Sequence, residues 1–319
     1  MKYIIALFIS LFYISCSTSS NTIIETEVPQ ESGKPLGTWI LNSQNIDDNS
    51  SKSQFFANCS SRGIRHIDQT IDIKLLENGS YEIDNESNLT NFIIEVYKEG
   101  MTFNILVNDA DAFNGDKHLD SLKKLESIID FNNRLISSIG VGVLGVKYRV
   151  DLTSSTGWKE NKHQATYDYL YYLIRAKDKI KREGANLLLS VDASAGWDSS
   201  SYSISFNTKE KKFIYHIIDI VDYVTLFSFS RDEENIYSAI SDELRYVRDK
   251  QKRECIVPSL AVSPQQNITD TFYDVDDNGV SFWNTLNGFQ EVIKDDIRVP
   301  MIMIENYHHF DQIPPVKPN

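Results

Sequence analysis

Carboxyl groups follow several apolar segments of this chain, and the surroundings of Asp151 are the most informative. In residues 146–152, β-branched and aromatic side chains alternate with charged ones, which predicts a buried strand. A polar loop at 153–157 and an amphipathic helix at 163–182 follow it. An acidic side chain where a buried strand opens into a loop, ahead of a crossover helix, is how (β/α) barrels present acid–base chemistry.

Other acidic residues stand at comparable places, close to the ends of predicted strands. These further candidates are Asp68, Asp109, Asp111, Asp192 and Glu305. In a barrel the carboxyl ends of the strands share one opening, so side chains from distant parts of the sequence can converge there. For Asp151 the alternative to catalysis is a role as an orienting hydrogen-bond acceptor. For Glu305 the alternative is a buried, hydrogen-bonded structural carboxylate.

Strand-like and helix-like segments alternate along the chain, which indicates parallel strands joined by helices. The predicted strands are 37–41, 64–73, 101–107, 146–152, 186–191, 223–229, 255–262 and 300–307. The predicted helices are 53–61, 89–98, 118–131, 163–182, 213–221, 233–251 and 281–293. We therefore predict an α/β fold, a single-domain (β/α)8 TIM barrel over residues 37–313 with a short or missing last helix, followed by a Pro-rich tail at 314–319. An open doubly wound sheet would need a glycine-rich phosphate turn after its first strand, and the sequence has none.

Several of these segments resemble glycoside-hydrolase-like TIM-barrel proteins. The matching segments are 55–68, 99–113, 148–158, 220–229 and 299–310. Asp151 falls on the Asp of the family's Asp-x-Glu-Pro strand, and Trp158 follows shortly after it. This sequence departs from the pattern at Thr153, in the place of the catalytic Glu, and at Ser154, in the place of Pro. Phe229 replaces the family's Tyr in the sixth strand, and the seventh strand ends without a carboxylate.

The resemblance implies a carbohydrate ligand at the barrel opening. Aromatic faces stack on pyranose rings while carboxylates accept hydrogen bonds from sugar hydroxyls. The expected substrate-binding residues are Asp68, Asp109, Asp192, Trp158, Trp197, Tyr307 and His308. Each aromatic residue has an alternative place in the core.

Catalysis does not carry over intact from the family, because glycoside hydrolysis needs two carboxyl groups and Thr153 cannot act as an acid. The remaining catalytic candidates are Asp151 and Glu305, the latter as a relocated acid. We expect a glycan-binding lipoprotein with degenerate catalysis. The alternatives are an active glycosidase that uses the relocated carboxylate, and a structural lipoprotein that binds a partner other than a glycan.

The first residues predict export and membrane attachment. Residues 1–15 have an apolar segment that is too short to span a bilayer and fits a signal peptide. Cys16 follows, and this boundary resembles a bacterial lipobox, although Tyr13 departs from the usual Leu. The resemblance implies lipidation of Cys16, a tether at 16–36 and a place in the bacterial cell envelope, periplasmic or surface-facing. The alternative is a structural Cys after an ordinary signal peptide.

Composition argues against other partners. The formal net charge of −13 disfavours binding to nucleic acid, which requires basic patches. Neither a metal site nor a cofactor site is expected, because Cys59 and Cys255 lack metal-ligand spacing and no phosphate loop occurs. Residues 274–279 match the opening of an EF-hand calcium loop, but Thr285 stands where the bidentate Glu belongs. An acidic turn ahead of a helix is the alternative.

Overall fold

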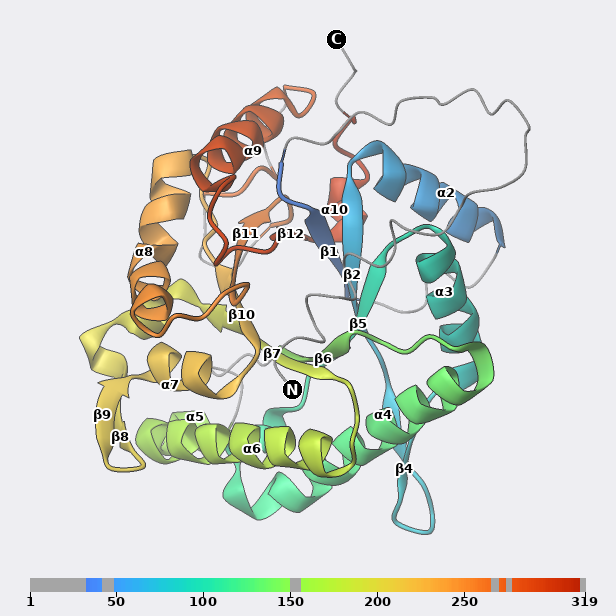
Figure 1. Ribbon diagram of the computed structural model, residues 1–319, viewed down its shortest axis with the longest axis vertical. Helices are drawn as coiled ribbons and strands as arrows, with labels where there is room; N and C mark the ends of the chain where they lie inside the picture. Colours follow the sequence, from blue (N-terminus) through green and yellow to red (C-terminus); the bar gives the residue numbers. More distant parts are fainter. Residues whose placement is uncertain (1–32, 42–48, 150–155, 265–269, 274–276, 316–319) are drawn as a thin grey trace. The chain divides into compact units, whose positions relative to one another are not determined.

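A computed structural model describes residues 33–41, 49–149, 156–264, 270–273 and 277–315, which all lie in one compact unit, Ser32–Asn319. Eight parallel strands form a closed barrel in the order β1-β12-β11-β10-β7-β6-β5-β2. Each barrel strand therefore lies beside its neighbours in sequence, and the last pairs with the first. The predicted α/β barrel is confirmed (Figure 1).

The barrel strands match the predicted segments closely. They are β1 Leu36–Ile40, β2 Ile64–Thr70, β5 Thr102–Val107, β6 Gly145–Arg149, β7 Leu188–Ser194, β10 Tyr223–Phe227, β11 Ile256–Ala261 and β12 Ile302–Glu305. Two antiparallel hairpins lie in the loops after β2 and β7. They consist of β3 Ile73–Leu75 with β4 Tyr81–Ile83, and of β8 Ser203–Phe206 with β9 Lys209–Lys212.

Helices surround the ring of strands (Figure 1). They are α2 Asn49–Ser61, α3 Glu86–Lys98, α4 His118–Ile139, α5 Thr156–Glu160, α6 Lys162–Arg182, α7 Phe213–Ile220, α8 Glu233–Asp249, α9 Val280–Ile293 and α10 Tyr307–Phe310. Short 3-10 turns are η3 Ala110–Phe113, η4 Gly115–Lys117, η6 Ala195–Asp198 and η7 Ser200–Tyr202. As predicted, the helix after the eighth strand is short. Within the described ranges, no helix is long and apolar enough to cross a bilayer.

Two segments differ from the sequence prediction. No strand is predicted between residues 73 and 89, but the β3–β4 hairpin lies there, and Lys74 pairs in it with Glu82 at 2.8 Å. The turn holds Asn78-Gly79, and Gly79 has the positive φ of 81° that this hairpin sequence favours. The eighth strand ends at Glu305 instead of residue 307, so Tyr307 begins a helix.

The two faces of each barrel strand are buried in different surroundings. On β6, Val146 and Tyr148 face outward, and the Tyr148 hydroxyl lies 2.6 Å from the Tyr172 hydroxyl of α6. The alternate residue Lys147 points inward, and its side chain is completely buried. Charged residues that alternate with apolar ones on β6 therefore fill the barrel interior.

Candidate functional site

A buried ammonium group lies at the centre of the barrel interior. The Nζ atom of Lys147 lies 2.5 Å from Oδ2 of Asp68, 2.8 Å from Oγ1 of Thr225 and 3.4 Å from Oδ1 of Asp192. The three partners come from β2, β10 and β7. Burial of an ammonium group is tolerated only when opposite charges compensate it, and here two carboxylates do so.

Asp68 is held on both of its oxygens. Its Oδ1 accepts a hydrogen bond of 2.8 Å from Nδ2 of Asn104 and lies 2.8 Å from Nε2 of His66. Burial disfavours its charge, but Lys147 and His66 outweigh this and hold the pKa of Asp68 well below its usual value. Asp68 is therefore a structural carboxylate in the interior network.

Two contacts cross the full width of the barrel at its carboxyl end, and we call them the transverse contacts. In the first, Nη2 of Arg149 lies 2.5 Å from Oε1 of Glu305, and their strands β6 and β12 stand opposite each other in the ring. In the second, Nε1 of Trp39 donates a 3.0 Å hydrogen bond to Oδ2 of Asp192, joining the opposite strands β1 and β7. The Arg149 guanidinium also lies over the Trp39 ring, 5.4 Å from its centre. These side chains fill the middle of the opening.

The acids in the transverse contacts keep unused hydrogen-bonding capacity. Burial raises the pKa of Asp192 to about 6, although Lys147 and Arg149 act against this shift. Among the described residues, Oδ1 of Asp192, Oε2 of Glu305 and Nη1 of Arg149 have no hydrogen-bond partner. Buried polar atoms normally have partners, so these three atoms are exceptions within the described part of the barrel.

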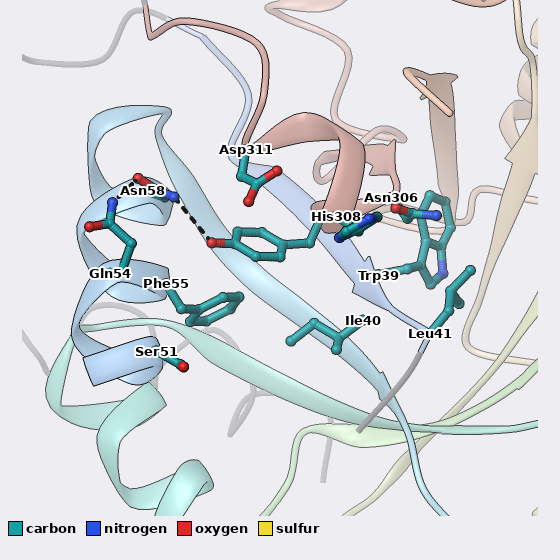
Figure 2. Close-up of a pocket in the computed structure, with 11 residues that line it drawn as sticks. Trp39, Ile40, Leu41, Ser51, Gln54, Phe55, Asn58, Asn306, His308 and Asp311 are labelled. Atoms are coloured by element: carbon teal, nitrogen blue, oxygen red, sulfur yellow. Dashed lines mark hydrogen bonds between the residues drawn. The ribbon is translucent and has the colours of Figure 1, made fainter. Parts of the chain in front are cut away.

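A pocket of about 500 Å³ opens beside the transverse contacts, between β1, α2 and α10 (Figure 2). We call it the α2–α10 pocket. Its lining residues are Trp39, Ile40, Leu41, Ser51, Gln54, Phe55, Asn58, Asn306, Tyr307, His308 and Asp311. Trp39 connects the pocket to the barrel interior, because its indole nitrogen reaches Asp192.

Amide and hydroxyl groups in the α2–α10 pocket form a chain of hydrogen bonds, drawn in Figure 2. Nε2 of Gln54 donates to Oδ1 of Asn58 at 2.8 Å, and Nδ2 of Asn58 donates to the Tyr307 hydroxyl at 3.3 Å. The Tyr307 ring packs edge-on against Phe55, with 4.5 Å between ring centres. Burial raises the pKa of Tyr307 to about 12, so it remains a neutral phenol at physiological pH.

Arg62 fixes the end of α10 against α2. Its Nε atom donates to the carbonyl oxygen of Ile313 at 3.0 Å, and Nη2 donates to the carbonyl oxygens of Asp311 and Ile313 at 2.8 and 2.6 Å. These contacts compensate for the missing long helix after β12. They hold the short helix that carries Tyr307, His308 and Asp311 in the pocket wall.

The predicted site residues fall into separate groups. Tyr307 and His308 line the α2–α10 pocket. Asp68, Asp192 and Glu305 are brought together inside the barrel, where each is almost completely buried.

Asp109 and Asp111 lie apart from both groups. Asp109 is buried after β5, and Lys124 of α4 binds its Oδ1 at 2.8 Å. Lys124 also pairs with Asp111, at 3.3 Å. This ion-pair cluster therefore belongs to the packing of α4.

The two predicted tryptophans have different surroundings. Trp158 of α5 is half-buried and stacks on Tyr202, with 6.0 Å between ring centres. The Lys162 ammonium lies 3.4 Å from the centre of the Tyr202 ring. Trp197 is only 8% exposed and packs on Phe213, which places it in the core.

Some predicted positions lie outside the described residues: Cys16, Asp151, Thr153 and Ser154. Part of the calcium-like segment, 274–276, does as well. In the described part of that segment, Oδ2 of Asp277 accepts a 2.8 Å hydrogen bond from the backbone nitrogen of Ser281 at the start of α9. This contact agrees with the alternative of an acidic turn. The described ranges contain no group of His, Cys, Asp and Glu placed to hold a metal ion.

Sequence reasoning missed several residues of the site. Lys147 and Arg149 had a signal, because charged residues that alternate within a buried parallel strand must point into the barrel. Trp39 lies near the end of the first strand, and this position is the feature by which the other aromatic candidates were identified. Gln54 and Asn58 could not be identified from the sequence, because amide side chains on a helix usually face solvent.

Comparisons with known proteins give the fold. No protein-family model and no curated protein sequence matches this chain. Among solved structures, the mannanase BCman of Bacillus subtilis is similar at 14% identity and a TM-score of 0.54, covering 89% of this chain and 83% of the mannanase.

Two further structures share this likeness. A β-glucosidase of Exiguobacterium marinum has 8% identity and a TM-score of 0.52, with coverages of 86% and 88% of the two chains. The spore cortex-lytic enzyme SleL of Bacillus megaterium QM B1551 has 11% identity and a TM-score of 0.51, with coverages of 90% and 75%. The chain therefore has the glycoside-hydrolase-like TIM-barrel fold that the motif order predicted.

Proposed function

We propose that this protein binds a glycan in the α2–α10 pocket and does not hydrolyse it. The observation that carries this proposal is the ion pair between Arg149 and Glu305 across the carboxyl end of the barrel. Glycoside hydrolysis requires two carboxyl groups on either side of the scissile bond. Here Glu305 is bound by Arg149, Asp192 is bound by Trp39, and the two acids are 3% and 2% exposed. Both acids are therefore engaged with other side chains of the barrel.

The chemistry of the α2–α10 pocket supports a sugar ligand. Trp39, Phe55 and Tyr307 supply aromatic surface, and Gln54, Asn58 and Asn306 supply amides that both donate and accept hydrogen bonds. A volume of about 500 Å³ is in the range of small-ligand sites. The similar folds of a mannanase and a β-glucosidase, whose names indicate glycan substrates, also support a glycan ligand.

Attachment to a membrane through Cys16 is part of the same proposal. The short apolar segment before Cys16 and the polar residues after it support export and a lipid-anchored tether in a bacterial envelope. Metabolic labelling with a fatty acid tests this in cells. Cys16→Ser is expected to abolish the label and release the protein from membranes, and persistence of the label would contradict the anchor.

Binding is tested with a glycan array, followed by calorimetry on the glycans that bind. Tyr307→Ala is expected to weaken binding by at least about tenfold, because it removes an aromatic contact and a hydroxyl. Tyr171→Ala is the matched control, since Tyr171 is 49% exposed on α6 and lies outside the pocket lining. Equal affinity of the two variants would contradict the pocket assignment. Absence of any glycan ligand would leave the non-glycan partner as the function.

The second candidate function is an active glycosidase. The raised pKa of Asp192, about 6, favours it, because an acid that titrates near neutral pH suits proton transfer. Release of new reducing ends from a bound glycan would show turnover. Loss of that release in Glu305→Gln, with binding retained, would overturn the binding-only proposal.

A further inference from the structure

The described residues that line the α2–α10 pocket include a carboxylate and no Lys or Arg, and this imbalance bears on the kind of glycan that fits the pocket. Its described lining includes Asp311 and no Lys or Arg. Among the described residues of the lining, the only basic side chain is His308.

Asp311 is in a position to accept a hydrogen bond from a ligand. It lies one helical turn after Tyr307, whose carbonyl oxygen accepts a 2.9 Å hydrogen bond from the Asp311 backbone nitrogen. Its Oδ1 is buried and has no hydrogen-bond partner among the described residues. Burial raises the pKa of Asp311, although His308, Arg62 and His309 act against this shift.

The nearest guanidinium is already used by the backbone. Arg62 donates from Nε and Nη2 to the carbonyl oxygens of Asp311 and Ile313, and from Nη1 to the carbonyl oxygen of Asn58. It lies behind the pocket wall and is not among the lining residues. Arg62 therefore offers no free N–H group to an anionic ligand.

Tyr307 complements Asp311 as a donor. Its hydroxyl oxygen accepts the hydrogen bond from Asn58, which leaves its own proton for an acceptor in the pocket. One donor and one acceptor thus stand on the same side of α10. A sugar ligand carries hydroxyls of both kinds, since one hydroxyl can donate to Asp311 while another accepts from Tyr307.

We propose, resting on the proposed glycan-binding function, that the α2–α10 pocket selects neutral sugars and rejects sugars that carry a carboxylate or sulfate, with Asp311 as the specificity-determining residue. An anionic sugar group would face the Asp311 carboxylate, while the nearby Arg62 guanidinium is bound to backbone carbonyl oxygens, and like charges that meet at a binding surface are unfavourable. The net charge of −13 acts in the same direction.

The test is a glycan array of matched pairs, each a neutral oligosaccharide and the same chain carrying a sialic or uronic acid, read at pH 8. Binding confined to the neutral members supports the proposal. Equal or tighter binding of the acidic members overturns the selectivity and leaves the glycan-binding function standing. Absence of binding to every pair overturns both.

Asp311→Asn separates the local carboxylate from the overall charge. The variant keeps the side-chain shape and removes the charge, so the affinity ratio of neutral to acidic partner is expected to fall by about tenfold. Asp178→Asn on α6 makes the same change in net charge at an exposed position outside the pocket, and its ratio is expected to stay within about twofold. An equal change of the ratio in both variants would overturn the role of Asp311.

Discussion

Arg149 and Glu305 belong to strands on opposite sides of the barrel, and their side chains meet at 2.5 Å across its carboxyl end. A TIM-barrel enzyme normally keeps this space for its substrate. Here two oppositely charged side chains occupy it, together with the Trp39 ring beneath the guanidinium. In the described part of the chain, these side chains occupy the middle of the barrel, and the α2–α10 pocket lies to one side of them.

The Arg149–Glu305 pair predicts a strong coupling between two single substitutions. Glu305→Leu leaves the Arg149 charge largely buried without its partner, so the free energy of unfolding is expected to fall by about 3 kcal/mol. Arg149→Met should have a similar effect, because it leaves the buried Glu305 carboxylate without its partner. The double variant should be more stable than the sum of the two losses implies. Urea unfolding of all four proteins measures this, and additive losses would show that the pair is not coupled.

We expect the protein to lose stability as the pH rises, because the buried carboxyl group of Glu243 must then ionise. It is fully buried on α8, neither of its oxygens has a hydrogen-bond partner among the described residues, and burial raises its pKa to about 7. Asp198 and Asp242 add to this rise, and Lys212 opposes it.

Because the folded state holds the Glu243 proton more tightly than the unfolded state, this stabilisation is complete below the unfolded pKa of 4.5. It is lost as the pH rises to about 7, and the loss amounts to about 3 kcal/mol. Glu243→Gln should therefore unfold at a higher temperature than the wild type at pH 8, with little difference at pH 4.5. Glu234→Gln, at an exposed position of the same helix, is the control. If both variants show the same pH dependence as the wild type, Glu243 is not the titrating group.

We expect a substitution of Arg62 to change glycan affinity more than it changes the stability of the barrel. Arg62→Lys keeps the positive charge. The lysine ammonium lacks the planar guanidinium that donates to the carbonyl oxygens of Asp311 and Ile313 together. The end of α10 should then be held less tightly, and glycan affinity should fall by about tenfold. Limited proteolysis should cut after Phe310 earlier than in the wild type. Arg65→Lys on β2 is the comparison, and equal behaviour of the two variants would remove the positioning role.

The fold followed from the sequence because its signal is local. Alternating apolar segments such as residues 146–152 and helices ended by Gly63 and Gly100 are short-range patterns, and both glycines have the positive φ expected at a helix end, 70° and 71°.

The site followed only in part because its contacts are long-range. Glu305 was identified as a candidate from its place at a strand end, but its partner Arg149 lies 156 residues away. No spacing rule joins two such residues; their meeting depends on the positions of β6 and β12 in the ring. Tyr307 was found as an aromatic residue at the end of the last predicted strand, whereas Asn58 contributes through a hydrogen bond that only the packing of α2 against α10 creates.

The closure of the ring between β1 and β12 also determines when the pocket comes into existence. Thr38 and Ile304, which join these strands through a 3.0 Å hydrogen bond, are 266 residues apart. During translation, β1 has no second neighbour until β12 has left the ribosome, so Trp39 and Tyr307 cannot yet share a cavity. The nascent barrel must remain open along one edge for nearly the whole of synthesis, and the ligand cannot assist its assembly before that edge is sealed.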